Sequence, residues 1–326
     1  MNKDTHAYFF AAKWPTGYRC PRCGHAHHYI IRTRRHPLYQ CRHCRHQTSL
    51  TAGTIMEDSR TPLDKWYAAL QLMIRPAGVN AVQLQAAIRV TYKTAWSMLM
   101  KVRKAISAFD ASQRLSGTVC ASLSFYGQDR WGRYPAMLRE KQPFAVMAVF
   151  RKSDNPNFPA HPVYVKLKAV LPALLNNRRI PKVLEPLLMN KHIDPSNCDY
   201  SVLGSSSTFK SLFNSVYLKP HAKVLSILGH IANNWLNHVF RGIGPKYRQH
   251  YWDEFSYRFN YTAVQASVQS SAQFFEHSSV HSNAQSSWQS LLQICLQKSY
   301  VSKLSEGDSA STFKKRPKST HNPLIA

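Results

Sequence analysis

The chain has 326 residues, and its 43 lysines and arginines against 16 aspartates and glutamates give a formal net charge of +27. This excess of positive charge favours a polyanionic partner, most often nucleic acid. No apolar run approaches the ~18 residues of a membrane-spanning helix and no signal peptide is evident, so we expect no membrane partner. The length allows two or three domains, and the 44% hydrophobic content is ample for a core.

Residues 1–50 contain four cysteines in two pairs, Cys20 with Cys23 and Cys41 with Cys44, separated by residues 24–40. Two intervening residues let a turn direct both thiolates to one metal, and the spacer is long enough for a hairpin that brings the second pair round. This spacing is typical of a closed, structural zinc ribbon. The alternatives are two disulfides or chance pairs. Gly24 follows the second thiolate, where a tight turn often requires a positive φ.

The other cysteines are isolated and odd in number, which indicates a reducing cytosol. They are Cys120, Cys198 and Cys295. We therefore expect a cytoplasmic, nucleoid-associated protein.

Short β-type runs at residues 29–31 and 38–40 predict the strands of the ribbon. This segment contains many arginines, which suit contact with phosphates; a solvated positive face is the alternative. The candidates for DNA contact are Arg32, Arg34, Arg35, Arg42 and Arg45.

Residues 51–112 predict a helix-turn-helix segment that follows a connector at 51–60. A first helix begins at Thr61 and Pro62, with threonine as the cap, and that unit ends at Gly78. Asn80 caps a short second helix, and Thr91 caps a longer helix that runs to about Phe109.

Two helices joined by a tight turn are typical of a helix-turn-helix, and an ordinary helical pair is the alternative. Trp96, Leu99 and Val102 fit the core of this unit better than base contacts. On the face expected to be exposed, the candidates for DNA contact are Lys93, Lys101, Arg103 and Lys104.

Residues 115–260 predict an α/β domain. Strands are expected at 119–126, 144–150 and 162–167, and helices at about 169–178 and 246–259. Asp253 and Glu254 lie on the last helix, where we expect a surface pair facing Arg258 or Lys246. Residues 261–326 are expected to form one short helix around Trp288–Ile294 and a disordered tail from Ser302. The fold class is therefore multidomain α+β.

Four stretches together resemble a family of bacterial insertion-sequence transposases. They are Cys20–His25, Thr51–Leu63, Tyr92–Met98 and Gly244–Asn260. In that family a zinc ribbon and a helix-turn-helix precede a ribonuclease H-like catalytic domain of the DDE type. The resemblance covers residues 8–260, and it implies DNA transposition through two magnesium ions held by carboxylates.

The chain departs from that family at the expected metal ligands. In the stretch Gly117–Gly127, Ser122 stands where the family has its first catalytic aspartate, and Gly204 stands at the second. A serine hydroxyl carries no charge and coordinates magnesium weakly. The third ligand position falls near Asn233 or Asn234.

We therefore expect a DNA-binding transposase-family protein that has lost catalysis, with structural zinc and with magnesium only if activity survives. Its expected partners are double-stranded DNA at element ends and further copies of itself. One alternative is an active transposase that uses relocated carboxylates from Asp129, Asp194 or Asp199. A second is a non-enzymatic regulator whose ribbon contacts protein.

Overall fold

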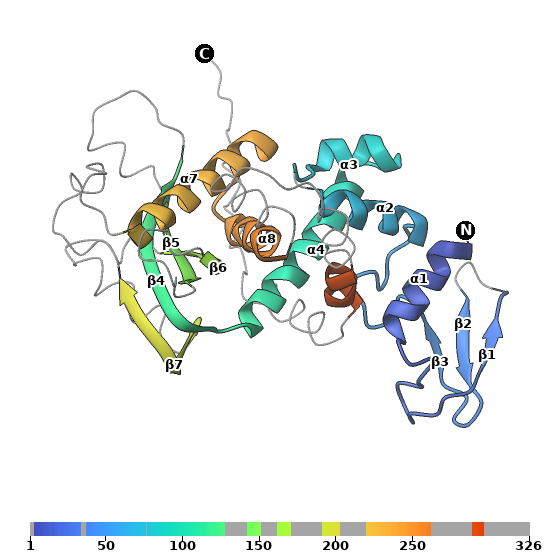
Figure 1. Cartoon of the computed structure of the whole chain (residues 1–326). Helices are drawn as coiled ribbons and strands as arrows, with labels where there is room; N and C mark the ends of the chain where they lie inside the picture. The colour runs from blue at the N-terminus through green and yellow to red at the C-terminus, as the bar shows by residue number, and fades with distance from the viewer. Residues whose placement is uncertain are drawn as a thin grey trace, which may run out of the picture.

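The computed structural model describes residues 3–33, 37–75, 77–127, 142–150, 162–170, 191–202, 220–261 and 289–296. Figure 1 shows two sheets at opposite ends of this part of the chain, with a layer of helices between them. Within it, no helix combines the length and hydropathy needed to cross a bilayer.

The N-terminal unit packs one helix, α1 (Lys3–Lys13), on a three-stranded antiparallel sheet. The strands are β1 (His28–Ile31), β2 (Leu38–Cys41) and β3 (Gln47–Ser49). The two expected ribbon strands are confirmed, whereas α1 and β3 had not been expected. Lys13 at the end of α1 donates hydrogen bonds to the carbonyls of Ser49, Leu50 and Ala52 at 2.8, 3.0 and 2.5 Å. These bonds hold α1 against the chain that leaves β3.

Three helices follow: α2 (Leu63–Met73), α3 (Ala81–Ile88) and α4 (Tyr92–Ser112). Both expected caps are confirmed, because Asn80 forms a capping box with Gln83 and the Thr91 side chain accepts a hydrogen bond from the Thr94 N–H. The expected cap at Thr61 is wrong. Pro62 is the N-cap residue of α2, in an extended conformation with ψ 148° and no side-chain cap.

One hydrophobic core runs through the ribbon and the helical layer. Tyr39 of β2, Trp66 of α2 and Leu99 of α4 belong to the same buried cluster. Residues 289–296 form the expected short helix and add Leu291 and Cys295 to this cluster. The Ile55 N–H donates to the Cys295 carbonyl at 3.1 Å. This hydrogen bond links the helix at 289–296 to the connector at 51–60.

The second sheet has the strand order β6-β5-β4-β7. Its strands are β4 (Leu115–Tyr126), β5 (Gln142–Phe150), β6 (Pro162–Ala169) and β7 (Ile193–Val202). The first three pair antiparallel, and β7 pairs parallel to β4. The three expected strands are confirmed. The helix expected at 169–178 falls almost wholly outside the described residues.

Two helices pack beside this sheet, α7 (Pro220–Phe240) and α8 (Arg248–Tyr261). The helix expected at 246–259 is confirmed as α8. Cys120 and Tyr126 of β4 share a buried cluster with Leu228 of α7 and Trp252 of α8, so these helices cover one face of the sheet. A separate apolar cluster, which includes Val119 and Ile193, contains the alternate residues of β4.

Polar side chains of α8 satisfy the outer edge of β6. Asn260 exchanges two hydrogen bonds with the Val165 backbone, both at 2.8 Å. Ser256 accepts from the Leu167 N–H at 3.1 Å, and Gln249 accepts from the Ala169 N–H at 2.7 Å while donating to the Leu167 carbonyl at 3.0 Å. An open strand edge is a template for unwanted pairing, and α8 closes this one.

The surface location expected for Asp253 and Glu254 is wrong, because both side chains are buried. The helix that carries them lies between α4 and β6, so both acids face protein. Glu254 pairs with Arg103 of α4 at 2.6 Å and with Arg258 at 2.8 Å, so the expected Arg258 partner is confirmed. Asp253 binds Lys168 of β6 at 2.6 Å, and Lys168 also binds Asp110 of α4 at 2.5 Å.

Candidate zinc site and nucleic-acid interface

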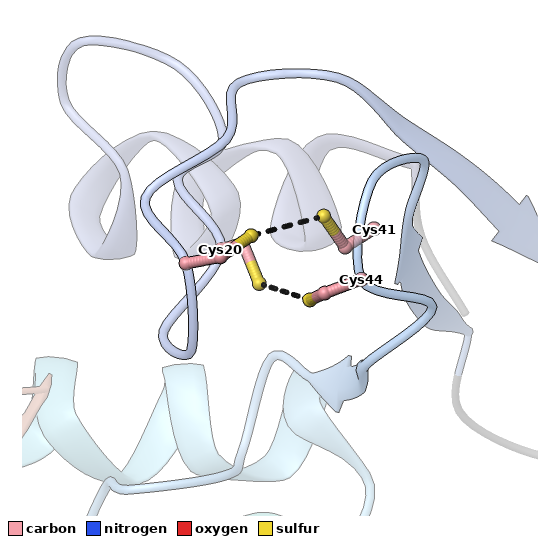
Figure 2. A group of neighbouring side chains, drawn as sticks. Cys20, Cys41 and Cys44 are labelled. Carbon is pink, nitrogen blue, oxygen red and sulfur yellow. Dashed lines mark hydrogen bonds between the residues drawn. The ribbon is translucent and has the colours of Figure 1, made fainter.

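The four cysteine sulfurs converge between two turns of the ribbon. The sulfurs of Cys20, Cys23, Cys41 and Cys44 all lie within 4.8 Å of one another. Cys20 and Cys44 are 3.5 Å apart, and Cys23 and Cys41 are 3.6 Å apart. Figure 2 shows side chains from both turns pointing toward one another.

The two turns repeat one backbone geometry. In the first, the Gly24 N–H donates to the Cys20 carbonyl at 2.9 Å, and in the second the Arg45 N–H donates to the Cys41 carbonyl at 3.1 Å. Gly24 has φ +74° and Arg45 has φ +55°, so both occupy the left-handed region. The positive φ expected at Gly24 is confirmed, and the second turn achieves the same shape without glycine.

The electrostatics of the cluster favour a bound cation. Burial opposes the Cys20 thiolate, but hydrogen bonds from the backbone of Arg22 and Cys23 and from the other thiols lower its pKa to about 6. The His25 backbone N–H favours the Cys23 thiolate, yet the thiols of Cys44 and Cys41 raise the Cys23 pKa to about 12. A dication between four close thiolates removes the repulsion among them.

The donor set fits zinc. Tetrahedral coordination with Zn–S bonds of about 2.3 Å places sulfurs about 3.8 Å apart, close to the separations in the cluster. Sulfur donors fill all four positions, which leaves no place for a reacting water, so the site is structural. Cys20 and Cys41 are buried beside Trp14, Tyr18 and Tyr39, and the metal site is therefore continuous with the core.

Three of the ribbon arginines expected to contact DNA are exposed: Arg32, Arg42 and Arg45. Arg34 and Arg35 lie outside the described residues. The Arg42 guanidinium lies 4.7 Å from the ring centre of Tyr29, which is 57% exposed on the edge strand β1. Sequence reasoning missed Tyr29. Its place before Ile30 and Ile31 gave no sign that its ring faces solvent beside a cation.

The four cations expected on the helix-turn-helix surface have different environments. Lys93 is exposed at the start of α4. Lys101 and Lys104 are half-buried, and Lys101 donates to the Glu57 carbonyl at 3.2 Å. The exposed location expected for Arg103 is wrong, because this side chain is 1% exposed and ion-paired with Glu254.

Two of the positions where the resemblance expects metal ligands, Ser122 and Asn233, lie on or against the second half of β4. Ser122 is buried there opposite Val146 of β5. Asn233 of α7 donates to the Phe125 carbonyl at 2.7 Å, and its Oδ1 has no hydrogen-bond partner among the described residues. Asn234 is exposed, and Gly204 lies outside the described residues.

The alternative carboxylates do not gather at this end of β4 where they are described. Ile193, next to Asp194, pairs with Leu115 at the far end of the strand. Leu115 lies about 23 Å from Ser122 at the usual ~3.3 Å rise per residue. Asp194 instead accepts hydrogen bonds from the N–H and the hydroxyl of Ser196. Asp129 and the side chain of Asp199 lie outside the described residues.

The sulfur cluster, the paired turns and the small antiparallel sheet define a zinc-ribbon domain. Residues 2–47 match the family model described as a transposase zinc-ribbon domain. The resemblance stated for this part of the chain is thereby confirmed.

One relative is a protein of a transposable element. Over 99 residues the chain is 30% identical to an "Uncharacterized protein in transposable element ISH50" of Halobacterium salinarum. The match covers 29% of this chain and 33% of that protein, so the chain spans about a third of the relative's length in the comparison. No solved structure matches the chain.

Proposed function

We propose that this chain is a DNA-binding transposase-family protein whose ribonuclease H-like domain lacks both metal-binding aspartates. The transposase zinc ribbon at residues 2–47 supports the family assignment. A mixed sheet with β4 at its centre, a parallel neighbour on one side and helices over one face is compatible with the shell that the resemblance implies.

The main support for the proposed loss of catalysis is the environment of Ser122. By the resemblance, this residue stands where the family has its first catalytic aspartate; it is 6% exposed and lies opposite Val146 of β5. Magnesium requires several oxygen ligands, usually carboxylates, near 2.1 Å. A neutral hydroxyl with Asn233 does not meet that requirement, so the side chains that the structure describes around Ser122 do not fit a magnesium pair.

Duplex DNA is the proposed partner because exposed cations occur on both N-terminal units. The ribbon presents Arg32, Arg42 and Arg45, and the helix-turn-helix presents Lys93. Arginine and lysine on exposed elements bind phosphates and release counterions. We propose that the chain occupies element ends, where transposase-family proteins assemble as homo-oligomers.

The test combines binding and nicking on a plasmid that carries the DNA flanking this gene. We expect binding whose affinity falls steeply with salt, and no nicking with Mg²⁺ or Mn²⁺. Replacing Arg42 and Lys93 with glutamine should weaken binding. The slope of log binding constant against log salt concentration should become shallower by roughly 2, about one unit for each phosphate that the variant no longer neutralises.

Metal-dependent nicking that disappears in Asp129→Ala or Asp199→Ala would establish relocated carboxylates instead. Asp194→Ala is the matched control, because Asp194 lies at the far end of the strand pair. Binding that does not respond to salt would favour the non-enzymatic regulator.

A further inference from the structure

A cavity of about 610 Å³ opens between the N-terminal ends of α3 and α4 and the loop that joins α7 to α8. We call it the aromatic groove and define it by Tyr92, Trp96, Arg241 and Tyr247. Its volume lies within the usual range of small-ligand sites, about 300–1,000 Å³. Neither the zinc site nor the positions of the family's metal ligands account for it.

Aromatic rings supply the walls of this groove. Tyr92 and Trp96 lie one turn apart on the same face of α4, and Tyr92 is 53% exposed. The Trp96 and Tyr247 rings meet edge to face with centres 5.4 Å apart. Flat apolar surfaces that remain open to solvent suit stacking with another planar ring.

The loop on the opposite side is held in place from beneath. The Ile243 N–H donates to the Tyr126 hydroxyl at 3.2 Å, and Arg248 donates to the Ile243 carbonyl at 2.9 Å. The Arg248 guanidinium also stacks 4.7 Å from the Tyr126 ring. A Cβ added at Gly242 or Gly244 would meet no atom within 4 Å among the described residues, so the loop faces open space. A loop fixed in this way loses little entropy when a ligand binds.

Positive charge lies at the rim. Arg241 is exposed at the end of α7, and the Lys246 ammonium is 5.0 Å from the Tyr247 ring centre. Aromatic walls with a cationic rim complement a nucleotide, because the base stacks inside while the phosphate stays near the cations. The groove also adjoins the exposed start of α4, which carries Lys93.

We propose that the aromatic groove binds one unpaired nucleotide of the DNA, with its base stacked on Tyr92 and Trp96 and its phosphate near Arg241. This inference rests on the proposed DNA-binding function and extends it to a preference for distorted DNA. A base inside a regular duplex is already stacked and paired, so it must leave the helix before it can enter such a site.

The experiment compares a fluorescently labelled duplex with the same duplex carrying a short unpaired bulge, by anisotropy at one salt concentration. The full chain should bind the bulged DNA about tenfold more tightly. Tyr92→Ala should remove most of that preference, and Tyr92→Phe should keep it because the ring remains. Tyr8→Ala is the matched control, since Tyr8 is 47% exposed on α1, away from the groove.

The two readouts separate the two proposals. Affinity for the regular duplex tests DNA binding, and the ratio of bulged to regular affinity tests the groove. A ratio near one, or a ratio unchanged in Tyr92→Ala, overturns the groove proposal while duplex binding stands. Tight binding of bulged DNA alone supports the groove and contradicts the duplex proposal. Binding to neither DNA overturns both.

Discussion

Gly24 and Arg45 occupy the same place in the two cysteine turns, and both have positive φ. In a left-handed conformation an L side chain costs about 1–2 kcal/mol, which glycine avoids. The first turn avoids this cost and the second bears it. A side chain at Gly24 would cost energy through its backbone conformation alone, because an added Cβ there would meet nothing within 4 Å in the described structure.

Gly24→Ala is therefore expected to lower the free energy of unfolding of the zinc-loaded protein by about 1 kcal/mol. Denaturant unfolding measures this change. Gly244→Ala is the matched control: its Cβ also meets open space, but its φ is ordinary, and its stability should change little or rise. Equal losses in the two variants would show that backbone strain is not the cause.

At the scale of elements, α8 holds the two halves of the described chain together. Glu254 bonds to Arg103 of α4, and Arg258 bonds to Glu254 and to the carbonyls of Arg75 and Met73 near the end of α2. These groups are buried, so each charge depends on its partner.

Glu254→Gln should lower the free energy of unfolding by about 3–5 kcal/mol, because it leaves two buried guanidinium groups without a counter-charge. Thermal or denaturant unfolding measures the loss. Glu57→Gln removes an exposed carboxylate and should cost less than about 1 kcal/mol. A Glu254→Gln protein as stable as the parent would mean that the network contributes specificity and no net stability.

Across the whole molecule, the sequence predicts features that depend on neighbouring residues and misses those that depend on distant ones. Cysteine spacing identified the metal site, and Asn80 and Thr91 marked their helices, because each acts on residues a few positions away. Arg103 and Glu254 were both expected at the surface, but they are buried against each other. They are 151 residues apart in the sequence, so the local pattern around either one gives no sign of the other. Local periodicity cannot place a charge that another element covers. The aromatic groove was not predicted either, because its lining comes from segments far apart in the sequence.

Zinc removal should act beyond the ribbon, because one core joins Tyr39, Trp66 and residues 289–296. Hydrogen exchange after chelation is expected to accelerate in residues 3–50, in α2 and in residues 289–296, with β4 to β6 less affected. Cys20→Ser should reproduce this pattern, and Cys120→Ala, outside the cluster, should not. Unchanged exchange in residues 3–50 of the metal-free protein would contradict a structural zinc.

The closure of the β6 edge by α8 has a consequence for biosynthesis. Ala169 and Arg248 are about 80 residues apart in the chain. At about 5–20 residues per second, a ribosome begins α8 roughly 4–16 s after it finishes β6. During that interval the backbone of Val165 and Leu167 lacks the side chains that later bind it. Neighbouring nascent chains on one messenger RNA could pair along this edge, and the net charge of +27 opposes that encounter by keeping copies apart.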